Sequence, residues 1–191
     1  MINKQEKLTK VKLKGNESFN IREGWLRKGI RCVQDCPTLF SRDDAMEILG
    51  VGSKMVKSIR YWLRATGLTE ERAPVGRARE QILTEKFGEV VDRYDRYFDD
   101  VFTLFLLHYN IVKNAEGLSV AWDIFFNNYD GQDFTKDNMI EKCKEELNKR
   151  LAEGATFSER LFADDCASIL RMYNTTDFAE DPEESLSCPL I

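Results

Sequence analysis

The spacing of apolar residues predicts a mostly helical chain with one distinctive unit near its N-terminal end. Residues 41–66 read as two short helices joined by a glycine turn, with Gly50 at the end of the first helix and Gly52 within the turn. Ser41 and Ser53 are placed to cap the two helices. The second helix has one apolar side, made of Met55, Val56, Ile59, Trp62 and Leu63.

The opposite side of that second helix is predicted to be polar and basic. It comprises Lys54, Lys57, Ser58 and Tyr61, with Arg60 and Arg64 flanking them. A positioning helix, a tight turn and a cationic second helix are typical of chains that enter a DNA major groove. Lysine and arginine would contact phosphates or guanine edges, and serine and tyrosine would add hydrogen bonds. The alternative interpretation is an amphipathic helix whose basic face is only solvated.

A hairpin pattern follows in residues 68–84, which read LTEERAPVGRAREQILT. Pro74, Val75 and Gly76 supply turn chemistry between two extended arms. Arg77 and Arg79 lie on the tip and return arm, in the position of the wing of a winged helix. The sequence therefore predicts a winged helix-turn-helix over residues 15–84, with Arg77 and Arg79 added to the DNA-binding residues.

The remaining pattern predicts a helical bundle. Helices are expected over 21–34 before the turn unit and, after it, over 85–114, 118–129, 136–151 and 158–173. The segment 101–112 is apolar nearly all round and is expected to be buried. The predicted fold is mainly α, with domains at 1–14 (a basic flexible arm), 15–84 (the winged helix), 85–175 (a helical domain) and 176–191 (an acidic tail).

Charge divides the chain along the same line. Residues 1–80 hold 17 Lys and Arg against 10 Asp and Glu, whereas residues 81–191 hold 11 against 23, so the net charge of −5 conceals a cationic N-terminal region. Such a region favours a polyanionic partner. Five cysteines, an odd number without regular spacing, predict reduced thiols and a cytoplasmic protein. No apolar run approaches the roughly 20 residues that span a bilayer, so no membrane association is predicted.

Residues that could carry chemistry each have an ordinary structural interpretation. The single histidine, His108, is expected to be buried and hydrogen-bonded rather than a general base. Two acidic groups could bind Mg²⁺ but are expected to form surface ion pairs: Asp92, Asp95, Asp99 and Asp100, and Glu159, Asp164 and Asp165. Cys32 and Cys36 are expected to act as small hydrophobic residues. The sequence predicts no catalytic residue, no metal site and no cofactor.

Long stretches of the chain resemble a bacterial family of unknown function. They are NESFNIREGWLRKGI at 16–30, FSRDDAMEILGVGSKMVKSIRYWLRATGLTEE at 40–71, DDVFTLFLLHYNIVKN at 99–114, AWDIFFNNY at 121–129 and SERLFADDCASILRMY at 158–173. The resemblance implies genes beside relatives of phosphoadenosine-phosphosulfate reductase, within DNA phosphorothioation and phage-defence clusters. A related component of a single-strand phosphorothioation system is linked to DNA nicking. The chain departs from the family motif, because Asn16 replaces a histidine, and the family's longer members lead us to expect a truncated chain.

Three hypotheses follow for the function. The leading one is an accessory or regulatory protein of a phosphorothioation or phage-defence system that binds double-stranded DNA, with an acidic lobe that docks sulfurtransferase or ATPase proteins or a second copy. The second is a metal-dependent nickase of the same system that uses acids such as Asp95 and Asp99. The third is a non-catalytic adapter in which the winged helix serves for protein docking.

Overall fold

The structure is a computed structural model that describes residues 7–22, 24–113, 117–131, 134–173 and 190. Its elements are, in order, α1 Trp25–Asp35, the 3-10 turn η1 Leu39–Ser41, α2 Ala45–Leu49, α3 Ser53–Ala65, β1 Thr69–Arg72, β2 Glu80–Leu83, α4 Gly88–Tyr94, α5 Val101–Val112, α6 Val120–Asn128, α7 Lys136–Arg150 and α8 Glu159–Tyr173. The prediction of a mainly helical chain with one small antiparallel hairpin is confirmed.

The first three helices form because their apolar stripes face one another. The stripe of α1 is buried, and this helix ends at Asp35 just before Pro37. A Cβ atom at Gly29 would lie 2.7 Å from the Leu63 side chain, so a residue without a side chain lets α1 and α3 approach closely. Gly50 ends α2 in the left-handed conformation, with φ of 58°, as predicted.

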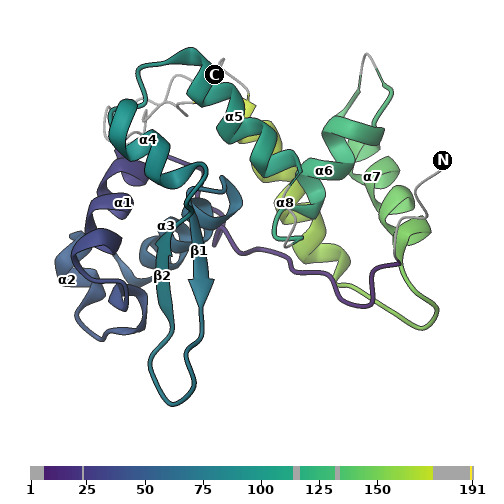
Figure 1. Ribbon diagram of the computed structural model, residues 1–191. Helices are drawn as coiled ribbons and strands as arrows, with labels where there is room; N and C mark the ends of the chain where they lie inside the picture. The colour runs from purple at the N-terminus through teal and green to yellow at the C-terminus, as the bar shows by residue number, and fades with distance from the viewer. Residues whose placement is uncertain (1–6, 23, 114–116, 132–133, 174–189, 191) are drawn as a thin grey trace.

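The hairpin is fixed at its base and projects at its tip. Strands β1 and β2 pair antiparallel from Thr69 opposite Leu83 to Arg72 opposite Glu80. The backbone amide of Gln81 donates to the Pro37 carbonyl at 2.8 Å, and its side-chain amide donates to the Thr69 hydroxyl at 2.6 Å. The first bond ties the hairpin to the segment after α1, and the second joins its two strands. The tip of the hairpin extends away from the other elements (Figure 1).

The long helical stretch predicted over residues 85–114 is broken in two. Between α4 and α5 the chain turns through Phe98, whose φ is 58°. The Asp95 carboxylate accepts the backbone amide of Asp99 at 2.9 Å, and the Asp100 carboxylate caps α5 by accepting the amide of Phe102 at 2.8 Å. Helix α5 then crosses from the α4 side of the molecule to α6 and α8 (Figure 1).

The expectation that residues 101–112 are buried was wrong for one face of α5. Leu107 and Ile111 are fully buried, but Phe102 and Phe105 are each 67% exposed. The reason is that α5 spans two packed groups of helices and has neighbours along only part of its circumference. None of the helices in the described ranges has the length and apolar character needed to cross a bilayer.

The N-terminal and C-terminal helices share one hydrophobic core across α3. Trp62 of α3 and Trp122 of α6, both buried, meet edge to face with ring centroids 5.6 Å apart. The side-chain amide of Asn110 on α5 donates to the Thr66 carbonyl at the end of α3 at 2.9 Å. The division predicted at residue 84 therefore falls between two groups of helices that pack against each other.

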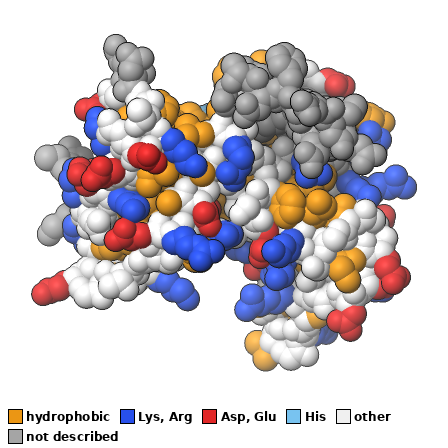
Figure 2. All heavy atoms as spheres, turned by 180° about the vertical axis from the view of Figure 1, so that it is seen from behind, with side chains coloured by type: hydrophobic (Ala, Val, Ile, Leu, Met, Phe, Trp, Pro, Cys, Tyr) orange, Lys and Arg blue, Asp and Glu red, His pale blue; other side chains and the backbone are white. Residues whose placement is uncertain are grey.

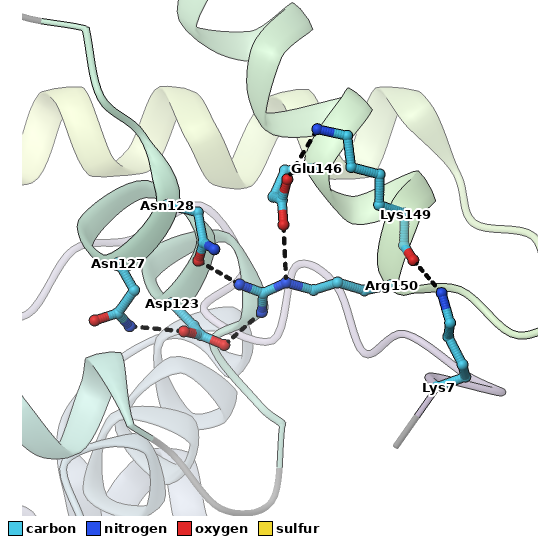
Figure 3. A network of polar contacts seen from close by, with 7 residues as sticks. All are labelled: Lys7, Asp123, Asn127, Asn128, Glu146, Lys149 and Arg150. Carbon is cyan, nitrogen blue, oxygen red and sulfur yellow. Dashed lines mark hydrogen bonds and ion pairs between the residues drawn. The ribbon is translucent and has the colours of Figure 1, made fainter. Parts of the chain in front are cut away.

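The segment predicted as a flexible arm is bound to the C-terminal helices over residues 7–14. The backbone of Leu8 pairs with the Arg150–Ala152 segment through two hydrogen bonds of 2.8 and 2.9 Å. In Figure 3 the Lys7 ammonium donates to the Lys149 carbonyl, and the Arg150 guanidinium lies among Asp123 and Asn128 of α6 and Glu146 of its own helix. Residues 1–6 and all of the predicted tail except Leu190 lie outside the described residues.

Candidate nucleic-acid interface

The predicted basic face of α3 is open to solvent only near the start of the helix. Lys54 and Lys57 are exposed, and the Lys57 ammonium lies 3.8 Å from the Glu17 carboxylate. The N-cap residue is Gly52, so Ser53 is the first helical residue and the prediction that it caps the helix was wrong. Gly52 has no side chain that could cap the helix. The first backbone amides of α3 therefore have no side-chain cap, and they lie at the same end of the helix as the two lysines.

Ser58 and Tyr61 do not belong to the open face, contrary to the sequence prediction. Ser58 is fully buried and its hydroxyl donates to the Phe19 carbonyl at 3.4 Å, while Tyr61 is 8% exposed and its hydroxyl donates to the Leu118 carbonyl at 3.2 Å. The segment at Gly15 covers the Tyr61 ring so closely that a Cβ there would lie 2.4 Å from it. These contacts join residues 39 to 57 positions apart in the chain, which helical periodicity cannot reveal.

Burial also fixes the charge of the Tyr61 phenol. Loss of water around the ring raises the pKa of Tyr61 well above its ordinary value, and the nearby Asp165 carboxylate raises it further. The phenol is therefore neutral at physiological pH. Tyr61 is a packing residue that connects α3 to the segment before α6.

Arg60 and Arg64 link α3 to the hairpin. Both guanidinium groups pair with the Glu71 carboxylate on β1, with the Arg60 Nε–Glu71 Oε1 distance at 2.7 Å and the Arg64 nitrogen at 3.2 Å. The side chains of Arg60 and Arg64 are 30% and 18% exposed. The two ion pairs fix the position of the hairpin beside α3. Arg60 and Arg64 are therefore not the open cations that the sequence predicted.

The hairpin itself presents exposed arginines, as predicted. Arg77 and Arg79 lie on its tip and return arm, and Arg72 at the end of β1 pairs with Glu70 at 3.0 Å. The Ser41 hydroxyl donates to the Arg79 carbonyl at 3.0 Å, so Ser41 holds the hairpin against η1 and does not cap α2 as expected.

Within the described part of the chain, no carboxylate lies within ion-pairing distance of Lys54, Arg77 or Arg79. Sequence reasoning missed one further cation, Lys28 on the polar side of α1. Its ammonium lies 3.6 Å from where a Cβ of Gly50 would be, beside the turn between α2 and α3.

Figure 2 shows Lys and Arg side chains on both sides of the hollow between the hairpin and the rest of the molecule. We call Lys54, Lys57, Arg77 and Arg79 the open basic surface.

The acidic residues considered for metal binding have structural contacts instead. The Asp92 carboxylate pairs with Arg96 and accepts from the Gln34 side chain, while the Asp95 carboxylate accepts backbone amides at the turn before α5. Among the described residues no three His, Cys, Asp or Glu side chains converge as metal ligands would. These carboxylates do not fit a magnesium site, and we derive no metal-dependent step from them.

The second acidic group anchors the N-terminal segment. The Asp164 carboxylate pairs with the Lys14 ammonium at 2.8 Å, and the buried Asp165 carboxylate accepts the Lys14 backbone amide at 3.0 Å. Burial raises the pKa of Asp165 to about 6, although the bond from Lys14 opposes the shift. Glu159, the third member, pairs with Lys144 of α7 at 2.8 Å.

The surroundings of His108, Cys32 and Cys36 agree only in part with the sequence prediction, because all three side chains are partly and not fully buried. The His108 ring is half-buried between Phe126 and Tyr173, with its Nδ1 2.7 Å from the Tyr173 hydroxyl oxygen, and burial lowers its pKa. Cys32 and Cys36 are free thiols in partly buried positions. None of these groups lies on the open basic surface.

Comparison with known proteins places the chain in a family. Residues 13–191 match the family described as "Protein of unknown function (DUF4007)". The chain belongs to this family. It is also similar to two solved structures of a protein named SspB, one of them bound to magnesium ion, each with 29% identity and a TM-score of 0.78. The match covers 94% of this chain and 54% of the SspB chain, so the chain spans about half the length of SspB. No curated protein sequence matches it.

Proposed function

We propose that this chain binds double-stranded DNA as an accessory or regulatory protein of a DNA phosphorothioation or phage-defence system. The observation that carries the proposal is the open basic surface, in which Lys54 and Lys57 lie at the start of α3 and Arg77 and Arg79 lie on the hairpin. Among the described residues, Lys54, Arg77 and Arg79 have no carboxylate within ion-pairing distance, and Lys57 has only the exposed contact with Glu17 at 3.8 Å. Such cations can neutralise phosphates and release counterions from DNA.

The order of elements supports a winged-helix mode of binding. Three helices precede an antiparallel hairpin, and the turn before α3 contains two glycines. In helix-turn-helix proteins the N-terminal residues of the second helix contact the bases, and this is the end of α3 that is exposed. The Glu71 pairs with Arg60 and Arg64 hold the hairpin beside the second half of the same helix.

The biological setting rests on the family. Members of the family resembled by this sequence are expected in phosphorothioation and phage-defence clusters, and the similarity to SspB supports the same setting. Sulfurtransferase or ATPase proteins of such a cluster are partners that we propose for the acidic C-terminal helices. A cytoplasmic location follows from this proposal.

Fluorescence anisotropy with a labelled duplex tests DNA binding. If the four cations of the open basic surface each neutralise one phosphate, the logarithm of the affinity falls with the logarithm of salt concentration with a slope of about −3 to −4. Arg77→Ala with Arg79→Ala should reduce the slope by about 2 and weaken binding about tenfold or more. Exposed cations of the C-terminal helices provide the matched control, Lys136→Ala with Arg160→Ala, which should leave both quantities unchanged. Salt-insensitive binding, or no binding to any duplex, would contradict the proposal.

The nickase and adapter hypotheses give different results. Relaxation of supercoiled plasmid in the presence of Mg²⁺ or Mn²⁺ by the wild type, but not by Asp95→Asn, would favour the nickase. Asparagine retains an acceptor oxygen for the Asp99 amide, so this variant separates catalysis from folding. Capture of a sulfurtransferase or ATPase that is lost in the Arg77→Ala, Arg79→Ala variant, without any DNA binding by the wild type, would favour the adapter.

A further inference from the structure

Helix α5 presents an apolar ridge to solvent. Val101, Phe102, Phe105 and Tyr109 are each between 59% and 67% exposed. Phe102, Phe105 and Tyr109 follow one another at spacings of three and four residues, the spacing of side chains along the seam between two packed helices. Soluble proteins seldom expose several large apolar side chains together unless another molecule covers them. We call these four residues the α5 ridge.

An apolar groove of about 360 Å³ runs beside the α5 ridge. It is lined by Val101, Leu104, Phe105, His108, Phe126, Tyr173 and Leu190. Its wall is held in place because the His108 ring contacts Phe126 and Tyr173 edge to face and shares a hydrogen bond with Tyr173. A ridge of aromatic side chains next to a groove of the same character is complementary to a second copy of the same surface.

Charges at the two ends of α5 select the orientation of that copy. Asp99 and Asp100 are exposed immediately before the helix, and Lys113 is exposed immediately after it. An antiparallel copy brings the acidic start of each helix to the basic end of the other and opposes the two helix dipoles. A parallel copy would place the acidic ends together. The charge pattern therefore matches an antiparallel pair of identical helices.

We propose that the α5 ridge is the interface of a homodimer, in which two copies of α5 pack antiparallel and each ridge enters the groove of the other. The exposed part of the ridge amounts to roughly 400–500 Å² per copy, if an aromatic side chain contributes about 200 Å² when fully exposed. Such an area is at the low end for specific interfaces, so the dimer is reversible and depends on concentration.

The proposed dimer is independent of DNA binding. In Figure 1 the hairpin tip projects from the side of the molecule opposite α5. The open basic surface of each copy is left uncovered by the α5 interface. Failure of DNA binding and failure of dimerisation are therefore separate outcomes of separate experiments.

Sedimentation velocity of the full chain, from low to high micromolar concentration, tests the proposal. The mass should rise from the 22.2 kDa of one chain towards twice that value. Phe105→Glu should raise the dimer dissociation constant at least about 100-fold, because a charge replaces an apolar contact at the centre of the interface. Met46→Glu, at an apolar position of α2 that is 45% exposed, is the matched control and should not change the constant.

A charge exchange tests the antiparallel orientation. Lys113→Asp should weaken the dimer about tenfold, and adding Asp99→Lys should restore it in part, since positions 99 and 113 then attract again with reversed signs while Asp100 is unchanged. Circular dichroism checks that each variant is folded. A wild type that is monomeric at every concentration, or a dimer that tolerates Phe105→Glu, would overturn the proposal. Failure of the charge exchange to restore dimerisation would overturn the antiparallel arrangement.

Discussion

Helices α3 and α5 depart in opposite directions from the environments that their sequences predict. The polar side of α3 was expected to face solvent, yet Ser58 and Tyr61 are buried and Arg60 and Arg64 pair with Glu71. The apolar helix α5 was expected in the core, yet the α5 ridge is exposed.

The difference lies in what packs against each helix. Helix α3 is surrounded by α1, the hairpin, the Gly15–Phe19 segment and the start of α6, so even its polar side chains find partners there. Helix α5 bridges two groups of helices and has neighbours on part of its surface only. Amphipathicity thus predicts which face of a helix packs against its neighbours, but it does not show whether segments distant in the chain cover the opposite face.

The largest expected contrast between the two helices concerns their aromatic residues. Trp62 is fully buried against Trp122, so Trp62→Ala should lower the free energy of unfolding by about 3–5 kcal/mol. Phe105→Ala, on the exposed α5 ridge, should lower it by less than about 1 kcal/mol. Urea denaturation at a concentration that keeps the chain monomeric measures both values. Equal losses would contradict the contrast.

The next effect concerns Asp165, the buried carboxyl near Tyr61. Its pKa of about 6 lies above the ordinary 3.8 because burial disfavours the charged form. The folded state therefore holds this proton more tightly than the unfolded chain. The resulting stabilisation is present below about pH 4 and is lost as pH rises through 6, a change of about 3 kcal/mol at 1.36 kcal/mol per pKa unit.

Asp165→Asn isolates this effect, because the amide oxygen can still accept the Lys14 amide without a charge. The variant should match the wild type near pH 4 and exceed its free energy of unfolding increasingly as pH rises to 8. Chemical denaturation across this pH range provides the measurement. A difference that does not vary with pH would show that the Asp165 carboxyl titrates normally.

A smaller effect is expected from the ion pairs between α3 and the hairpin. Glu71→Ala should cost about 1–2 kcal/mol of stability, because it removes a carboxylate that contacts two partly buried guanidinium groups. Glu70→Ala removes an exposed pair with Arg72 and should cost less than about 0.5 kcal/mol. Hydrogen exchange should also show weaker protection of β1 and β2 in Glu71→Ala only. The same loss in both variants would argue against a special role for Glu71.

The smallest expected effect separates packing from DNA binding on α3. Tyr61→Phe removes one hydrogen bond and should cost about 1 kcal/mol of stability without changing DNA affinity. Lys57→Ala should have the opposite profile, with little change in stability and weaker binding to duplex DNA. A loss of DNA affinity in Tyr61→Phe would show that the Tyr61 hydroxyl takes part in DNA binding.

Local chemistry determined most of the elements. The glycine turn, the hairpin around Pro74–Gly76 and helices α6, α7 and α8 were predictable to within a few residues, because apolar spacing and turn residues act over short distances. The break between α4 and α5 was not predicted. The break depends on the Asp95 and Asp100 carboxylates, which accept backbone amides. It was not predicted because the surrounding apolar and aromatic residues have the spacing of one continuous helix.

The sequence by itself determined that the chain is mainly helical, that its N-terminal region is basic, and that two arginines project from a hairpin. Only the tertiary structure decided which side chains of α3 are open, where residues 7–14 are anchored, and that α5 exposes its ridge. The physical reason is that helical period places a residue on one side of its own helix, whereas burial depends on segments such as Gly15–Phe19 and α8 that lie far away along the chain.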